Sequence, residues 1–394
     1  MMSSSDNDPV RACLRWDDAG DRALRGLDAS GWLAVMEVVR RRHGQALLAR
    51  RLSRAPDLTV PEDVVEELQR YKLAVAARAL AGLARLAPAV EASGVPVMAL
   101  KGLDLASRIY GDFGSRPMGD MDILVRPEHV GKMAAALQAQ GFRACSALRQ
   151  SSHHQVFYSP LPGGLPVELH WALGCNAGQT DPAELLEAAW REAEQIDIAG
   201  SQFLVMNRQH LLLYLCHHLE RHLFNTPLTQ VWDLGEILQQ AGTGFDWQRF
   251  WEHCDRYGQR KGAQAAMHLA AACLGIRVGT PPLPPEVQDL LPDIAANLGR
   301  YPQSEAREPS VDLVLLFGAR TPLSIRWRIL RRTLFPSRRL LAEAGGGGAG
   351  PASYAALWWK VLTNFARKRI FARIVAPPLR TRSSRAARLS EWLR

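Results

Sequence analysis

The pattern of apolar and polar positions predicts two helices near the start of the chain, over residues 28–55 and 62–93. The second helix follows Pro61 and has two acidic residues in its first turn, as is typical of a helix start. These two helices make an N-terminal helical segment covering 28–93. We expect residues 1–27, which precede the pattern, to be disordered or loosely ordered.

From residue 94 onward the apolar runs become short and are separated by turns containing Gly and Pro. A helix is predicted over Leu103–Tyr110 and another from Pro127 to Gln140. The runs of strand length are Val95–Leu100, Asp120–Val125, Phe142–Ala144, Gln155–Tyr158, Val167–Trp171, Gln195–Ile198 and Gln202–Val205. This alternation predicts a small mixed αβ core over residues 94–206.

The remainder of the chain returns to helical spacing. Helices are predicted at about 208–223, 227–240, 246–257 and 261–273. They make a helical domain over 207–300. Residues 301–394 form a basic C-terminal region with helices at Ile325–Thr333 and Ala355–Ile374 and a flexible Gly-rich linker at Gly345–Gly350. The fold class expected is therefore α+β, a small mixed αβ core with N-terminal helices and a larger helical C-terminal part.

Composition changes this picture little, but charge adds to it. Apolar residues make up 47% and charged residues 22% of the 394 positions, which is ordinary for a soluble globular protein. The net charge is +9, yet residues 326–394 hold sixteen Lys or Arg and only two acids. The rest of the chain is therefore net acidic, and the basic character belongs to the tail.

The sequence pattern gives no indication of secretion or membrane insertion. Residues 1–10 are polar and lack the apolar region of a signal peptide, and the six cysteines are scattered singly. The longest uninterrupted apolar runs, such as Leu211–Cys216, are far shorter than the roughly 20 residues of a membrane span. We expect a cytoplasmic protein with no transmembrane segment.

Candidate chemistry begins on the predicted strand Asp120–Val125. Because side chains alternate along a strand, Asp120 and Asp122 share one face, about 7 Å apart at their Cα atoms, and can converge on one metal ion. Carboxylate oxygens suit Mg²⁺, which completes its shell with substrate phosphates. A third carboxylate is needed for a second ion, and Glu168 is the best candidate. Its strand is predicted to turn Val167, Leu169 and Trp171 to the core and to turn Glu168 and His170 away.

A turn upstream of this strand offers an anion site. The strand Val95–Leu100 leads into Lys101-Gly102 and then into a helix. This order directs backbone N–H groups and the positive end of a helix dipole toward the place where a triphosphate would lie. The alternative is a plain turn, just as the alternative for the acidic strand is a solvated face.

Taken together, these residues resemble the uncharacterised nucleotidyltransferase family of the polymerase-β-like superfamily. The resemblance covers about residues 30–270. It is carried by Ala99-Leu100-Lys101-Gly102, Tyr110, Arg116, Asp120 to Val125, Gly141-Phe142, Val167-Glu168-Leu169-His170-Trp171, Leu211–His218 and Trp232-Asp233-Leu234. Gly102 is followed by Leu103, where the superfamily usually has Ser or Gly, and 18 positions separate Gly102 from Asp120. Both departures suit this particular family.

The resemblance implies a polymerase-β-like nucleotidyltransferase fold with helical flanks and a Mg²⁺-dependent enzyme, with Mn²⁺ as the alternative ion. By analogy Asp120 and Asp122 bind both metals, and Glu168 binds the second and activates the acceptor. The Lys101-Gly102 turn holds the triphosphate of an NTP such as ATP. Arg116 is expected to neutralise phosphate charge on the leaving group, and an exposed loop arginine is the alternative.

Several histidines are further candidates. His170, His217 and His218 are expected near the site, where they contact the nucleotide or the acceptor or support the residues that do. The pairs His153-His154 and His217-His218 have no HExxH order, so we do not expect zinc binding. Asp233, which follows Trp232, is expected to be a structural helix residue.

The expected reaction is transfer of a nucleoside monophosphate from an NTP to a hydroxyl or phosphate of an unknown small-molecule, peptide or protein acceptor. One alternative is a glycosyltransferase whose DxD binds a metal and a nucleotide-sugar. Those enzymes generally place an α/β nucleotide-binding unit before the DxD, whereas mostly helical sequence precedes it here. Another alternative is a catalytically inactive module that binds nucleotide or a partner. The basic tail is expected to be a packed helix with a solvated face, with an acidic partner, nucleic acid or acidic lipid as alternative contacts.

Overall fold

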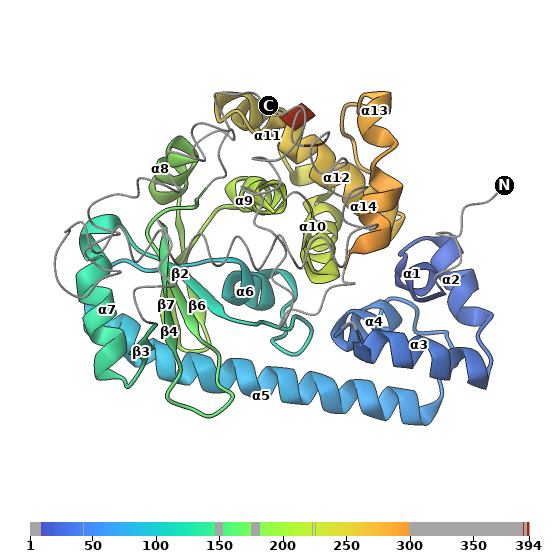
Figure 1. Cartoon of the computed structure of the whole chain (residues 1–394), viewed down its shortest axis with the longest axis horizontal. Coiled ribbons are helices and arrows are strands. Elements are labelled where there is room, and N and C mark those ends of the chain that lie inside the picture. The colour runs from blue at the N-terminus through green and yellow to red at the C-terminus, as the bar shows by residue number, and fades with distance from the viewer. Residues whose placement is uncertain are drawn as a thin grey trace, which may run out of the picture.

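A seven-stranded mixed sheet lies at the centre of the computed structural model, with helices packed on both of its faces (Figure 1). The structure describes residues 9–298 except 42, 146–152, 175–181, 223 and 225, together with 389, 392 and 393. The basic helices and the Gly-rich linker expected within 301–394 lie outside the described residues. The α+β class predicted from the sequence is confirmed.

The strands of this sheet come from the region predicted as the αβ core. They are β1 (Met98–Ala99), β2 (Met121–Leu124), β3 (Arg143–Ala144), β4 (His154–Tyr158), β5 (Val167–His170), β6 (Glu194–Ile198) and β7 (Ser201–Val205). Their order across the sheet is β3-β4-β5-β2-β1-β7-β6. The pairs β2–β5 and β1–β7 are parallel and the other pairs are antiparallel. The strand β2 therefore lies in the middle of the sheet, between β5 and β1.

Helices precede, interrupt and follow the sheet. Those before it are α1 (Pro9–Leu14), α2 (Asp18–Arg25), α3 (Ala29–Arg41), α4 (Gln45–Leu52) and α5 (Glu62–Ser93). Those between strands are α6 (Lys101–Asp104), the π-helix η1 (Leu105–Ile109), the 3-10 helix η2 (Pro127–His129), α7 (Val130–Ala139) and α8 (Ala183–Arg191). Those after it are α9 (Arg208–Arg221), α10 (Leu228–Ala241), η4 (Gly242–Gly244), α11 (Trp247–Arg256), α12 (Arg260–Leu274), α13 (Pro285–Gln288) and α14 (Leu291–Asn297).

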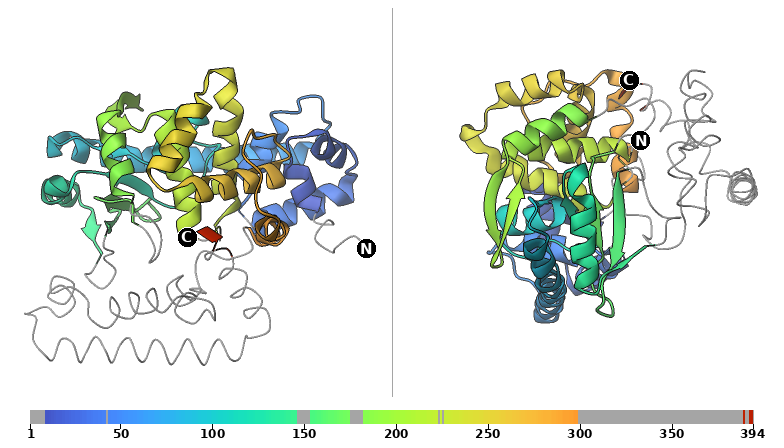
Figure 2. Two further views of the ribbon diagram at one scale, coloured as in Figure 1. Left: turned by 90° about the horizontal axis from the view of Figure 1, so that it is seen from above. Right: turned by 90° about the vertical axis from the view of Figure 1, so that its left-hand side faces the viewer.

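Two hydrophobic cores cover the two faces of the sheet. On one face, Leu83 and Leu86 of α5 and Leu137 of α7 pack against Ile123 and Val125. On the other face, Leu124 packs with the helices of the C-terminal half, and this second core extends to α1–α4. Figure 2 shows α1–α4 gathered at one end of α5, with α7 near the other end. The central strand is thus buried on both faces.

The N-terminal part differs from the sequence-based expectation in two ways. Residues 9–25 form two helices that pack into the core, where the expectation was loose order, and Leu24 is 2% exposed. Arg51 of α4 is buried and binds the carboxylate of Asp21 on α2, which secures this segment. The helix expected over 28–55 is two helices, because His43 adopts the left-handed φ of 51° and ends the first one.

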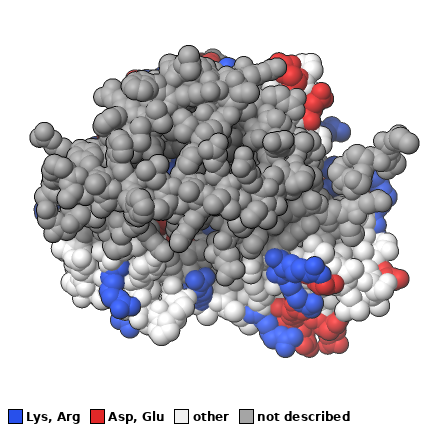
Figure 3. Space-filling model, viewed as in Figure 1, with Lys and Arg blue, Asp and Glu red and all other residues white. Residues whose placement is uncertain are grey.

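The long helix α5 is a candidate membrane span, which the uninterrupted apolar runs did not indicate. By length and composition alone it is long and apolar enough to cross a membrane. Arg78 and Arg85 interrupt its apolar residues, so the sequence pattern did not single it out. In this fold Leu83 and Leu86 pack against the sheet. Near the other end of α5, Glu67 pairs with Arg40 of α3. Figure 3 shows Lys and Arg side chains next to Asp and Glu side chains at the lower right of the molecule.

We expect Gly235→Ala to destabilise the protein by about 1–3 kcal/mol, the usual cost of overpacking a core. Gly235 lies within α10, and a Cβ there would be 2.3 Å from Leu274 Cδ1 and 2.6 Å from Trp16 Cη2. The matched control is Gly131→Ala on α7, where a Cβ would meet nothing within 4 Å. Urea unfolding followed by circular dichroism measures both changes. Equal stability of the two variants would contradict the tight contact at Gly235.

Candidate active site

The acidic residues of the central strand lie where both faces of the sheet are covered. Asp122 is on β2 and is 2% exposed, and Asp120 is half-buried just before the strand begins. The alternation predicted from the sequence holds, because Met121 and Ile123 pack in the core on one face and Leu124 packs in the core on the other. Asp122 shares the face of Leu124.

The third carboxylate lies beside them. The strand β5 pairs with β2 in parallel, and the register sets Glu168 directly next to Asp122. Neighbouring strands lie about 4.8 Å apart, so the two carboxylates share one small region of the sheet. His170, two residues later, places its Nε2 3.0 Å from Asp122 Oδ1 and 3.4 Å from Glu168 Oε2. Glu168 and His170 were expected to face away from the core, yet His170 is only 4% exposed because the C-terminal helices cover this face as well.

The Lys101-Gly102 turn lies on the other side of β2. The Nζ of Lys101 is 3.0 Å from Asp122 Oδ1. The backbone of Lys101 adopts an unusual left-handed φ of 28°. Such a conformation is strained for a residue with a side chain, and strained backbone of this kind often occurs at functional sites. A Cβ on Gly102 would lie 2.7 Å from Met118 Sδ, so glycine allows the turn to pack closely on the loop that leads into β2. The turn and the acidic strand are therefore in direct contact.

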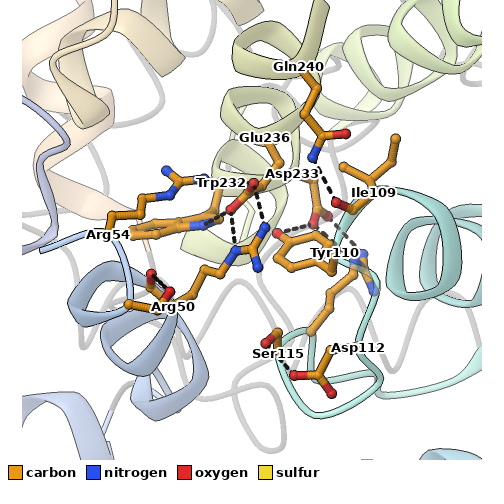
Figure 4. A network of polar contacts seen from close by, with 12 residues as sticks. Arg50, Arg54, Ile109, Tyr110, Asp112, Ser115, Trp232, Asp233, Glu236 and Gln240 are labelled. Atoms are coloured by element: carbon orange, nitrogen blue, oxygen red, sulfur yellow. Dashed lines mark hydrogen bonds and ion pairs between the residues drawn. The ribbon is translucent and has the colours of Figure 1, made fainter. Parts of the chain in front are cut away.

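Arg116 lies close to the Lys101-Gly102 turn and pairs with a carboxylate of α10. Its Nε and Nη2 bind Asp233 Oδ1 and Oδ2 at 2.9 and 2.8 Å, and the hydroxyl of Tyr110 donates to Asp233 Oδ1 at 2.8 Å (Figure 4). A Cβ on Gly102 would lie 3.4 Å from Arg116 Nη1, so the guanidinium also lies close to the turn. The alternative of an exposed loop arginine is wrong, because Arg116 is 7% exposed. Asp233 is a buried partner of this arginine, which agrees with the structural role expected for it.

Charge at the site is unevenly balanced. Burial by itself would raise the pKa of Asp122, but the charge of Lys101 and the hydrogen bond from His170 bring it below its usual range. Burial, followed by the charge of Asp122, raises the pKa of Asp120 to about 7. Burial would also raise the pKa of Glu168, and the hydrogen bond from His170 lowers it overall. Asp120 is thus the carboxylate that gains most from a further cation.

The two neighbouring histidines of α9 point to different surroundings. His217 is buried, with its Nδ1 3.0 Å from Gln259 Oε1 and its Nε2 2.9 Å from the carbonyl oxygen of Gly174. Both of its ring nitrogens are therefore engaged in joining α9 to neighbouring segments. His218 is buried beside Tyr214, and burial followed by the charge of Lys101 lowers its pKa well below the usual value. His217 therefore serves packing, and His218 is buried within range of the charge of Lys101.

The sequence pattern did not indicate one further residue at the site. His154 is the first residue of β4, paired in register with His170, and its Nε2 is 3.8 Å from Glu168 Oε2. The strand was expected to begin one residue later, at Gln155, which left His154 outside it. Alternation from Val156 and Tyr158 would have placed His154 on their face, but the register with β5 cannot be read from the chain.

The raised pKa of Asp120 predicts a pH-dependent stability in chelator-treated protein. Its carboxyl binds a proton up to about pH 7 when folded and up to about pH 4 when unfolded, so stability is lost as pH rises through this window. Asp120→Asn removes this loss. Thermal unfolding in EDTA should therefore favour the variant over the native protein more at pH 8 than at pH 5. If the difference in melting temperature between the variant and the native protein is the same at both pH values or reverses, the pKa of Asp120 is not raised in the folded protein.

A family model described as uncharacterised nucleotidyltransferase matches residues 28–275, which is more than half of the chain. No curated protein and no solved structure matches the chain. The matched span starts just before α3, includes the whole sheet with its three carboxylates, and ends directly after α12. The chain therefore belongs to the uncharacterised nucleotidyltransferase family.

Proposed function

We propose that the protein transfers a nucleoside monophosphate from an NTP to a hydroxyl or phosphate of an acceptor, with the help of divalent metal ions. The observation that carries the proposal is the convergence of Asp120, Asp122 and Glu168 on adjacent strands beside the Lys101-Gly102 turn. Membership of a nucleotidyltransferase family supports the reaction class. The acceptor in this reaction is a small molecule, peptide or protein that carries the hydroxyl or phosphate.

The donor set suits a hard dication such as Mg²⁺, or Mn²⁺ in its place. Three carboxylates lie close together, and the pKa of Asp120 is raised to about 7 by burial and by the charge of Asp122. This crowding of negative charge is relieved when a cation binds, which is the fit expected of a metal site. When bound, the ions stabilise charge on the attacking and leaving oxygens of an in-line displacement. Asp120, Asp122 and Glu168 are the residues proposed to hold them.

The side chains around the carboxylates have separate tasks in this scheme. Glu168, partly exposed at 24%, accepts the proton of the attacking hydroxyl. Lys101 keeps its positive charge, because the neighbouring Asp122 outweighs the effect of burial on its pKa, and nucleotide phosphates offer it a second anionic partner. Arg116, fixed by Asp233, holds the loop against the back of the turn and adds positive charge near the phosphates.

We expect Asp122→Asn to lower pyrophosphate release from NTPs by at least roughly 100-fold. Loss of a residue that only supports a metal ligand costs up to about 100-fold in activity, and loss of a ligand should cost at least as much. The full-length protein is incubated with each NTP and Mg²⁺, and released pyrophosphate is measured. Glu128→Gln, which changes an exposed carboxylate on η2, is the matched control and should keep full activity. Circular dichroism establishes that both variants fold.

Other outcomes of this experiment would redirect the assignment. Equal pyrophosphate release from Asp122→Asn would contradict a metal role for this strand. Release of a nucleoside diphosphate from a nucleotide-sugar would support the glycosyltransferase. Saturable NTP binding without turnover of any acceptor would support a binding module. Among the described elements, β2 is preceded by helices α1–α6, by η1 and by the two-residue strand β1. This order favours the nucleotidyltransferase over a fold with an α/β nucleotide-binding unit before the DxD.

The proposal extends to location and to the basic tail. A cytoplasmic location is supported by the scattered cysteines. Residues 326–394 supply a candidate contact for an acidic partner or nucleic acid. Leu389 packs in the main core and Lys261 donates to the carbonyl of Trp392, so deletion of the tail would disturb the fold. Charge-removing substitutions are the better test.

We therefore expect the triple variant Arg367→Gln, Lys368→Gln, Arg369→Gln to bind single-stranded RNA with a weaker salt dependence if the tail is a nucleic-acid contact. Each lost phosphate contact lowers the slope of log affinity against log salt by about 0.7. The measurement is fluorescence anisotropy at several salt concentrations, with the native chain as reference. An unchanged slope would remove these three residues from any nucleic-acid surface.

A further inference from the structure

Two imidazoles and a carboxylate meet at the edge of the proposed site. His154 on β4 and Glu168 and His170 on β5 each place one ligand atom within 4.8 Å of the other two. The antiparallel register pairs His154 with His170, and their rings are 4.9 Å apart at an interplanar angle of 34°. These three ligand atoms are close enough to share one ion.

The distances suit a transition metal. Two ligands that each lie about 2.1 Å from a tetrahedral ion are about 3.4 Å from each other. His170 Nε2 is 3.4 Å from Glu168 Oε2, and His154 Nε2 is 3.8 Å from the same oxygen. The remaining edge, between the two imidazole nitrogens, is no longer than 4.8 Å. His170 Nε2 also donates to Asp122 Oδ1 at 3.0 Å, and an ion bound at Nε2 takes the place of that proton.

The side chains are also accessible enough to bind an ion from solution. The side chains of His154 and Glu168 are 19% and 24% exposed, whereas the side chain of His170 is 6% exposed and fixes one corner of the group. The adjacent His153 accepts a hydrogen bond at Nε2 from Arg221 Nη1 at 2.8 Å and does not belong to the group.

We propose that His154, Glu168 and His170 bind a transition-metal dication of the Zn²⁺ class through two imidazole nitrogens and one carboxylate oxygen. Imidazole favours zinc and similar ions, whereas Mg²⁺ prefers oxygen donors throughout. Three protein ligands leave a fourth position open for an oxygen of water or substrate. The inference rests on the proposed function in that it assigns a nitrogen-bound ion to the Glu168 side of that site, while Asp120 and Asp122 supply only oxygen.

The test uses Co²⁺ alone as a spectroscopic substitute for zinc. Chelator-treated full-length protein is titrated with CoCl₂, and the visible absorption of four- or five-coordinate Co²⁺ is recorded. We expect the native protein to bind one equivalent, which Zn²⁺ displaces, and His154→Gln to bind at least about 10-fold more weakly. His153→Gln is the matched control, and Asp120→Asn tests whether the carboxylate pair contributes. Both should keep the native absorption.

Two outcomes overturn the site: native protein without visible Co²⁺ absorption, or His154→Gln that binds Co²⁺ as the native protein does. Should His154→Gln fail to fold, X-ray absorption of the zinc-loaded native protein counts the imidazole ligands. Two imidazoles support the site, and none or one overturns it. Pyrophosphate release with Mg²⁺ is measured on the same preparations. Activity without Co²⁺ binding overturns only this inference, and Co²⁺ binding without activity overturns only the proposed transferase.

Discussion

A carboxylate buried in the middle of a sheet must be compensated, and Asp122 shows how this fold meets that demand. Taking a charge out of water is costly unless it is paired and hydrogen-bonded. The Nζ of Lys101, in the turn after β1, and the Nε2 of His170, on β5, both lie 3.0 Å from one of its oxygens. The buried charge thereby fixes the turn before β2 and the strand beside it in a single arrangement. Asp120 has less compensation, and this difference separates the two acids.

A second buried charge couples the sheet to the helical half. Asp233 on α10 holds Arg116 and Tyr110. Glu236, one turn later, accepts from Trp232 Nε1 and pairs with Arg50 of α4 and with Arg54, which follows that helix (Figure 4). Removing one partner of such a buried pair is costly because the other is left unpaired. The helical domain, the N-terminal helices and the loop behind the Lys101-Gly102 turn are therefore joined through one face of α10. This rigid support suits a site whose groups must keep their positions.

Much of the fold followed from local patterns. The strand period placed Asp122 and Glu168 correctly on β2 and β5, because the alternation of side chains depends only on the backbone. Helices α9–α12 were also expected at nearly the observed bounds, whereas the short helices α13 and α14 were not expected. The order of residues 9–25 was missed, since it depends on burial of Leu24 and on the pairing of Arg51 with Asp21, which are distant in the chain. The break at His43 was missed because a left-handed backbone has no strong signal at histidine.

The sequence by itself determined which residues had the chemistry: a DxD on an apolar strand, a Lys-Gly turn before it and an acid on a later strand. Tertiary structure alone decided which of them meet. The register of β2 and β5 sets Asp122 beside Glu168, and that of β4 and β5 sets His154 beside His170. Register depends on contacts between segments far apart in sequence. The packing of α9 likewise decided that His217 contacts Gln259 and the carbonyl oxygen of Gly174, since both partners lie far from it in the chain.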